Sequence, residues 1–173
     1  MKQRYTCYLS MGANLGNREQ TLCRALELLG EADGVRLECV SGIYETEPWG
    51  HRDQPGFLNL ALRLQTHLSP LQLLDCCQQI EARLGRERRE KWGPRTIDID
   101  LLYIPGVHLD TERLTLPHPY MFQRSFVLVP LEEIAGKEAF EGRSLADWLQ
   151  ACTDTGGIQR IKDRPFYGDF AEI

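Results

Sequence analysis

Hydrophobic and polar residues alternate in several short stretches of the chain, and this spacing is typical of half-buried β-strands. The clearest stretch is 57–65, where one side would present leucines and the other a mixed set: Leu58, Leu60, Leu62 and Leu64 against Phe57, Asn59, Ala61 and Arg63. Similar patterns predict strands over 4–11, 35–44 and 96–104.

Apolar residues spaced three or four positions apart predict amphipathic helices between these strands. The first helix would begin after Asn17, which can cap it, and would end at Gly30. The second would begin at Ser69-Pro70, with serine as the cap and proline in the first turn, and would end at Gly85. Two more helices are expected near 124–135 and at 144–152.

The predicted order is β-α-β-β-α-β followed by helices, which is the order of the ferredoxin-like split βαβ sandwich, an α+β fold. Neither a linker nor an internal repeat is visible in the 173 residues. We therefore expect a single domain over 1–173, in which 153–173 forms a turn-rich tail of unknown role.

Composition limits the classes of protein that this chain can be. Hydrophobic residues make up 42% and charged residues 26%, as in ordinary soluble domains, and no apolar run is long enough to span a bilayer. Without a signal region before the first strand, we expect a cytoplasmic monomer whose six scattered cysteines are reduced thiols. The net charge of −5 argues against a nucleic acid partner, and without a long apolar run we expect no membrane partner either.

Two carboxylates interrupt the apolar strand predicted over 96–104. Asp98 and Asp100 stand two residues apart, so strand geometry places both on one face. Two like charges there are costly unless a cation lies between them, and carboxylate oxygens suit Mg²⁺ that is shared with substrate phosphates. The alternative is an exposed strand face paired with nearby arginines, and the spacing alone leaves both interpretations open.

A basic loop comes directly before this carboxylate pair. Between 86 and 95 there are five cations and only two acids; the cations are Arg86, Arg88, Arg89, Lys91 and Arg95. Guanidinium groups bind phosphate oxygens through paired hydrogen bonds, although a charge run is often only a solvated surface. Next to the carboxylates, the loop favours a phosphoryl-transfer site, and neither a P-loop motif nor a dinucleotide-binding glycine motif is present.

Residues 91–100, with the sequence KWGPRTIDID, closely resemble the signature of the hydroxymethyldihydropterin pyrophosphokinase family. Three further blocks, at 12–16, 53–59 and 116–119, resemble the family in the same order, so the resemblance covers about residues 5–135. It implies an enzyme of folate biosynthesis that moves diphosphate from ATP to 6-hydroxymethyl-7,8-dihydropterin and releases AMP, with Mg²⁺ as cofactor.

The resemblance also implies roles for individual residues. Asp98 and Asp100 would hold two Mg²⁺ ions, and with Arg86 and Arg95 they would form the catalytic set. The residues expected to bind ATP are Arg86, Arg88, Trp92, Arg95, Leu101, Arg113, Thr115, His118 and Arg124. Those expected to bind the pterin are Thr46, Trp49, Phe57, Asn59, Trp92 and Phe126.

The strand pattern independently supports one part of this site. Phe57 and Asn59 would share a strand face, where an amide can match the donor and acceptor edge of a pterin and an aromatic ring can stack on it. A polar residue on a half-solvated strand is the plainer interpretation of Asn59.

Two other functions, RNA binding and metal-dependent nuclease activity, fit the sequence less well. A ferredoxin-like RNA-binding module would use the basic loop, but the aromatic sheet motif of such modules is missing and the net charge is negative. A metal-dependent nuclease would need more than the two clear carboxylates that the chain offers. We therefore expect the pyrophosphokinase activity.

Overall fold

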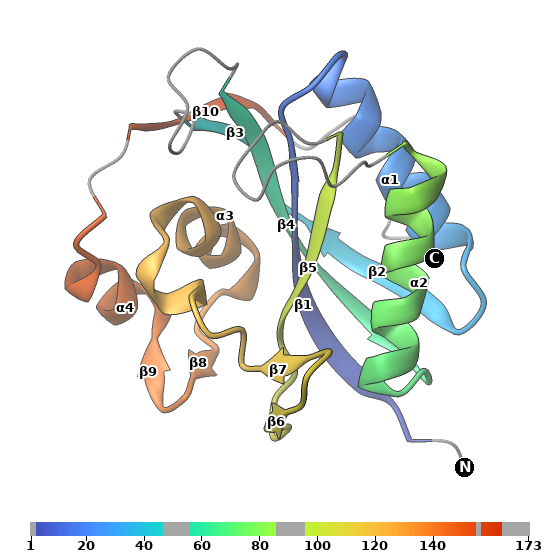
Figure 1. Ribbon diagram of the computed structural model, residues 1–173. Helices are drawn as coiled ribbons and strands as arrows, with labels where there is room; N and C mark the ends of the chain where they lie inside the picture. The colour runs from blue at the N-terminus through green and yellow to red at the C-terminus, as the bar shows by residue number, and fades with distance from the viewer. Residues whose placement is uncertain (1–2, 47–55, 86–95, 155–156, 164–173) are drawn as a thin grey trace.

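The computed structural model describes residues 3–46, 56–85, 96–154 and 157–163, and its centre is a six-stranded antiparallel sheet (Figure 1). Along the sheet the strands follow the order β10 (Ile158–Lys162), β3 (Ile43–Thr46), β4 (Phe57–Thr66), β1 (Tyr5–Ala13) and β5 (Asp98–Tyr103). Strand β2 (Val35–Val40) pairs with β4 next to β3, so β2 and β3 follow one another along the same edge of β4.

Helices cover both faces of this sheet (Figure 1). The helices α1 (Arg18–Glu31) and α2 (Pro70–Arg83) lie on one face, and α3 (Ser125–Ala135) and α4 (Leu145–Ala151) lie on the other. Two small hairpins and one 3₁₀ turn complete the described chain: β6 (Leu109–Asp110) with β7 (Thr115–Leu116), β8 (Ala139–Phe140) with β9 (Arg143–Ser144), and η1 (Met121–Gln123).

The alternation in β4 determines which residues enter each core. The four leucines at 58, 60, 62 and 64 pack with α1 and α2 in a first cluster, as the sequence predicted. Ala61 belongs to a second cluster under α3, together with Tyr8, Leu131 and Phe140. The face that carries Phe57 and Asn59 is therefore the face that α3 partly covers.

Local sequence signals explain most of the helix ends. The Asn17 side chain accepts a hydrogen bond from the Gln20 N–H at 3.1 Å, and Ser69 forms a full capping box at the start of α2. Gly85 follows α2 with a positive φ of 82°, as expected for a helix end. The expected stop at Gly30 is wrong: α1 continues to Glu31, because the buried leucines of its last turn outweigh the cost of about 1 kcal/mol for a helical glycine.

The strand predicted over 35–44 is also wrong as a single element. Ser41 interrupts it, because its Oγ accepts a hydrogen bond from the Ala61 N–H and its own N–H donates to the Ala61 carbonyl, both at 2.9 Å. The Gly42 N–H donates to the Glu133 carboxylate instead of to a strand. The chain resumes as β3, and in the tail where the sequence predicted only turns, β10 adds a strand.

All six cysteines lie in described segments and are free thiols, as the sequence predicted. Burial raises the pKa of the Cys7 thiol to about 12, so it behaves as a small apolar side chain of the core. Within the described residues, no helix combines the length and the apolar character needed to cross a membrane.

Candidate active site

The two predicted metal ligands begin β5 on the α3 face of the sheet. In the strand register Asp98 lies opposite Gly12 of β1, and Gly12 lies opposite Asn59 of β4. Residues directly opposite one another share a face and have Cα atoms about 4.5–5.5 Å apart, so the Cα atoms of Asp98 and Asn59 are about 10 Å apart. Asp100 and Ser10 occupy the next row on the same face.

Asn59 is nearly buried and held in one orientation. The residue is 6% exposed, and its Nδ2 donates to the Thr46 Oγ1 at 3.0 Å and lies 3.4 Å from the Phe57 carbonyl oxygen. A carbonyl oxygen only accepts hydrogen bonds, so the amide nitrogen must face it and Oδ1 must point the other way. The structure thus brings together Thr46, Phe57 and Asn59, which were all expected in the pterin pocket.

Gly12 is a member of this site that the sequence analysis did not assign. A Cβ atom at this position would lie 3.1 Å from Asn59 Oδ1 and 3.6 Å from Cδ1 of the Phe57 ring. The absence of a side chain therefore leaves the space that the amide and the ring occupy. The available signal was a glycine inside an apolar strand, which often marks a close approach.

Glu81 of α2 contacts the backbone of β5 between the two carboxylates. The residue is 7% exposed, and its Oε2 accepts a hydrogen bond from the Ile99 N–H at 2.9 Å. Ile99 lies between Asp98 and Asp100, so this contact fixes the backbone from which both carboxylates project. An acid four residues after Cys77 on the buried face of a helix was the signal that sequence reasoning missed.

A second group of expected residues lies beside the outer edge of β5. The His118 N–H donates to the Leu102 carbonyl at 2.8 Å, which places His118 against that strand. The Arg124 guanidinium lies over two rings, 5.1 Å from the centre of Tyr120 and 5.6 Å from that of Phe126. Tyr120 in turn packs edge-on against His118, with 6.1 Å between the ring centres, so Arg124 lies between this pair and Phe126, which is expected at the pterin.

His118 is a neutral imidazole at neutral pH. Burial, and then the positive charge of Arg124, lower the pKa of His118 to about 4. Its Nδ1 accepts a hydrogen bond from the Tyr120 N–H at 3.2 Å, which is also consistent with an unprotonated ring nitrogen. The imidazole can donate and accept hydrogen bonds here, but it is a weak proton acceptor.

Three other expected nucleotide residues are more widely spread. Arg113 donates to the Asp75 carboxylate and, at 3.2 Å, to Gln78 Oε1, so its side chain reaches across to α2. Thr115 lies in β7, and the Leu101 side chain is buried in the first cluster under α1 and α2. The remaining expected residues lie outside the described residues: Trp49, Arg86, Arg88, Trp92 and Arg95.

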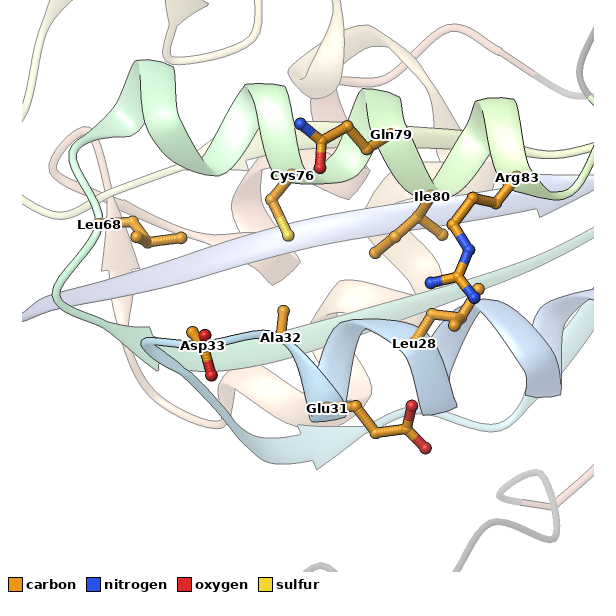
Figure 2. Close-up of a pocket in the computed structure, with 9 residues that line it drawn as sticks. All are labelled: Leu28, Glu31, Ala32, Asp33, Leu68, Cys76, Gln79, Ile80 and Arg83. Atoms are coloured by element: carbon orange, nitrogen blue, oxygen red, sulfur yellow. The ribbon is translucent and has the colours of Figure 1, made fainter.

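A cleft of about 380 Å³ lies between α1 and α2, on the other face of the sheet (Figure 2). Its walls include Glu31 and Leu28 from α1 and Cys76 and Arg83 from α2. None of the expected ATP-binding or pterin-binding residues that the structure describes lines it, and Asp98, Asp100 and Asn59 lie on the α3 face.

Comparison with known proteins shows which family the chain resembles in sequence. The family profile of the 7,8-dihydro-6-hydroxymethylpterin-pyrophosphokinases matches residues 8–136. The chain belongs to this family. It is therefore an ATP-dependent pyrophosphokinase of folate biosynthesis, as the signature at 91–100 predicted.

Individual family members match the chain almost from end to end. It is 44% identical over 155 residues to a pyrophosphokinase of Methylorubrum extorquens, covering 90% of this chain and 98% of the relative. A pyrophosphokinase of Bacillus subtilis is 42% identical over 163 residues, which cover 94% of each chain. Among solved structures, the HPPK-DHPS protein of Plasmodium falciparum has the same fold, with a TM-score of 0.69 at 16% identity; the match covers 87% of this chain and 44% of that protein.

The carboxylate pair fits the metal that the family implies. Asp98 and Asp100 are half-exposed and share a strand face, and the described residues contain no group of three or more metal-binding side chains. Mg²⁺ is commonly held by only one or two carboxylates, with waters and substrate phosphates as its other ligands. The donor set is therefore suited to a Mg²⁺ that arrives with a nucleotide.

Proposed function

We propose that the chain catalyses transfer of a diphosphate group from ATP to the hydroxymethyl oxygen of 6-hydroxymethyl-7,8-dihydropterin, with release of AMP. The observation that carries the proposal is the row formed by Asp98, Gly12 and Asn59 across three neighbouring strands. The Asp98 carboxylate, proposed to lie on the phosphate side, and the nearly buried Asn59 amide share one face, and the Cα atoms of these two residues are about 10 Å apart. An extended phosphate chain and a small heterocycle that meet end to end fit this spacing.

The pterin would bind at the Asn59 end of the row. The Thr46 hydroxyl and the Phe57 carbonyl accept the two N–H groups of the Asn59 amide, which leaves Oδ1 to accept a hydrogen bond from the polar edge of the ring. Phe57 and Phe126 are proposed to stack on the faces of the pterin, and Trp49 and Trp92 to complete the pocket. This arrangement accounts for an amide that is nearly buried yet turned toward the site.

ATP would bind along β5. Asp98 and Asp100 would hold two Mg²⁺ ions, and these ions would neutralise part of the phosphate charge. We propose that Arg86 and Arg95 hold the reacting phosphates with Arg88, and that Arg113, Thr115, His118 and Arg124 contact the rest of the nucleotide. Leu101 would contribute only its backbone, because its side chain is buried on the other face of the sheet. These cations and the carboxylate pair would align the phosphate chain for displacement at the β-phosphorus.

The pterin hydroxyl would attack the β-phosphorus while the bond to the bridging oxygen of AMP breaks. Since the pKa of His118 is about 4, the imidazole is a poor base for the hydroxyl proton. Catalysis would then depend on positioning and on charge, with Asp98 and Asp100 assisting the proton only secondarily.

The direct test is to incubate the protein with ATP, Mg²⁺ and 6-hydroxymethyl-7,8-dihydropterin and to measure AMP. AMP should form only when the pterin is present. Release of AMP or ADP at the same rate without the pterin would contradict the proposal.

A first prediction concerns the carboxylate pair. Asp98→Asn and Asp100→Asn should each remove nearly all turnover while circular dichroism stays unchanged, because each removes a negative charge from the metal-binding face. Asp110→Asn, at an exposed aspartate of β6, is the matched control and should keep normal turnover. Near-normal turnover in either site variant would contradict the metal assignment.

We also propose a finer description of the fold. The order β5-β1-β4 followed by β2 and β3, with α1 and α2 on one face, supports a ferredoxin-like core. The single domain over 1–173, the monomeric state and the cytoplasmic location stay predictions from the sequence.

A further inference from the structure

Strand β10 pairs with β3 at the border of the sheet, close to the pterin end of the site (Figure 1). Ile158 lies opposite Thr46 and Arg160 lies opposite Tyr44. The family profile ends at residue 136, so β10 lies outside the matched segment. Nothing in the proposed chemistry uses this strand.

Glu133 of α3 connects β10 with β3. Its Oε1 lies 2.9 Å from both the Arg160 guanidinium and the Tyr44 hydroxyl, which donates to it. Its Oε2 accepts a hydrogen bond from the Gly42 N–H. One carboxylate thus holds the start of β3, the middle of β3 and the β10 strand that covers its outer edge.

Gly42 allows this close approach. A Cβ atom there would lie 2.7 Å from Arg160 Nε and 2.7 Å from the Lys162 carbonyl oxygen. Any larger residue at this position would push Arg160 away from Glu133. The contact between Arg160 and Glu133 is therefore built into the packing at the β2–β3 break.

Strand β3 needs such support because it has only four residues. Its last residue is Thr46, whose hydroxyl orients the Asn59 amide, and its Tyr44 lies opposite Asn59. Without β10, β3 would lie at the border of the sheet, where the end of a short strand opens readily because it has few partners. Any displacement of β3 would move Thr46 relative to Asn59.

We propose that the Arg160–Glu133 contact is a positioning device for the pterin pocket, through which β10 holds β3 so that Thr46 stays bonded to Asn59. This proposal rests on the proposed function of the site. It assigns to Arg160 and Glu133 an effect on pterin recognition although neither belongs to the residues that would touch the pterin.

Arg160→Gln tests the proposal, because it removes the charge but keeps most of the side-chain stem. The dissociation constant for 6-hydroxymethyl-7,8-dihydropterin should rise about tenfold, while that for a non-hydrolysable ATP analogue and kcat at saturating pterin change less than about twofold. Arg160→Lys should restore part of the pterin affinity. Lys162→Gln is the matched control on β10: its amine pairs with Glu19 of α1, so both affinities should stay normal.

Unchanged pterin affinity in Arg160→Gln, equal losses for both ligands, or the same loss in Lys162→Gln would overturn the proposal. A second readout needs no ligand: the NMR signal of the Asn59 side-chain amide should shift and the β3 backbone amides should exchange faster in Arg160→Gln only. If the unaltered protein binds no pterin, the proposed function fails, and this NMR comparison still decides the positioning role. Unchanged signals would then overturn it.

Discussion

At the scale of single residues, the Asn59 amide nitrogen faces the Thr46 hydroxyl and the Phe57 carbonyl, so Oδ1 is the polar atom of Asn59 that remains for a ligand. Thr46→Val keeps the shape of the side chain but removes the acceptor. We expect it to weaken pterin binding by about 0.5–1.5 kcal/mol, since the amide loses the nearer of the two acceptors that hold it. Thr46→Ser keeps the hydroxyl and should bind nearly normally in the same calorimetric titration; equal losses in both variants would mean that the methyl group matters instead.

His118 should make the stability of the ligand-free protein depend on pH. Its pKa is about 4 in the folded state and about 6.5 in an unfolded chain, so the unfolded state binds more protons between these values. The free energy of unfolding should therefore decrease as the pH falls from about 6.5 to 4.

Denaturant unfolding at several pH values checks this expectation. His118→Gln should lose part of the decrease, whereas the exposed His67→Gln should keep it. Identical pH profiles for the two variants would contradict a buried neutral imidazole at position 118.

Sequence reasoning at this scale found residues whose placement follows from one strand alone. Asp98 and Asp100 share a face because they are two residues apart, and the same rule placed Phe57 with Asn59. Gly12 was not found, because its role depends on the register between β1 and β4 and on the space above the strand. Contacts of that kind are not encoded in the spacing of one segment.

At the scale of elements, α2 and β5 meet through the hydrogen bond from Ile99 to Glu81. Glu81→Ala should lower the free energy of unfolding by about 1–3 kcal/mol, because the Ile99 N–H loses its buried acceptor. Turnover should fall as well, since the backbone between Asp98 and Asp100 becomes less well fixed.

Denaturant unfolding and AMP release measure these two effects. Gln79→Ala, at an exposed position two residues earlier on α2, is the control and should change neither. A stable Glu81→Ala protein with full turnover would show that the link between helix and strand is dispensable.

The ends of the elements that have a complete local sequence signal were predicted to within two residues. Strands β1, β4 and β5 and helices α3 and α4 have either clean alternation or a helical apolar face. The break between β2 and β3 was missed because it depends on Ala61 and Glu133, which are distant in sequence. Strand β10 was missed for a related reason, since its exposed residues carry little pattern and its place is set by pairing with β3.

At the scale of the whole molecule, two hydrophobic clusters share one sheet. Leu26 lies in the cluster under α1 and α2, and Phe140 lies in the cluster under α3. Because the same strands contribute to both, we expect one cooperative unfolding transition. Leu26→Ala and Phe140→Ala should each shift the whole transition, by about 2–5 kcal/mol.

Two probes can test this on the same sample. Fluorescence of Trp148, which packs against the second cluster, reports on the α3 face once Trp49→Phe and Trp92→Phe remove the other tryptophans. Far-UV circular dichroism reports on all helices and strands. The two midpoints should coincide in every variant, and separate midpoints would mean that the two faces unfold independently.

Strand β5 has β1 as its one strand neighbour among the described residues. An apolar strand at the border of a sheet can recruit strands from other molecules, and charged side chains are a common protection against such aggregation. Asp98 and Asp100 supply two negative charges at the start of this strand, so the side chains proposed to bind metal would also keep the protein soluble. The Asp→Asn variants should therefore aggregate at lower concentrations than the unaltered protein, which light scattering would reveal before any assay of turnover.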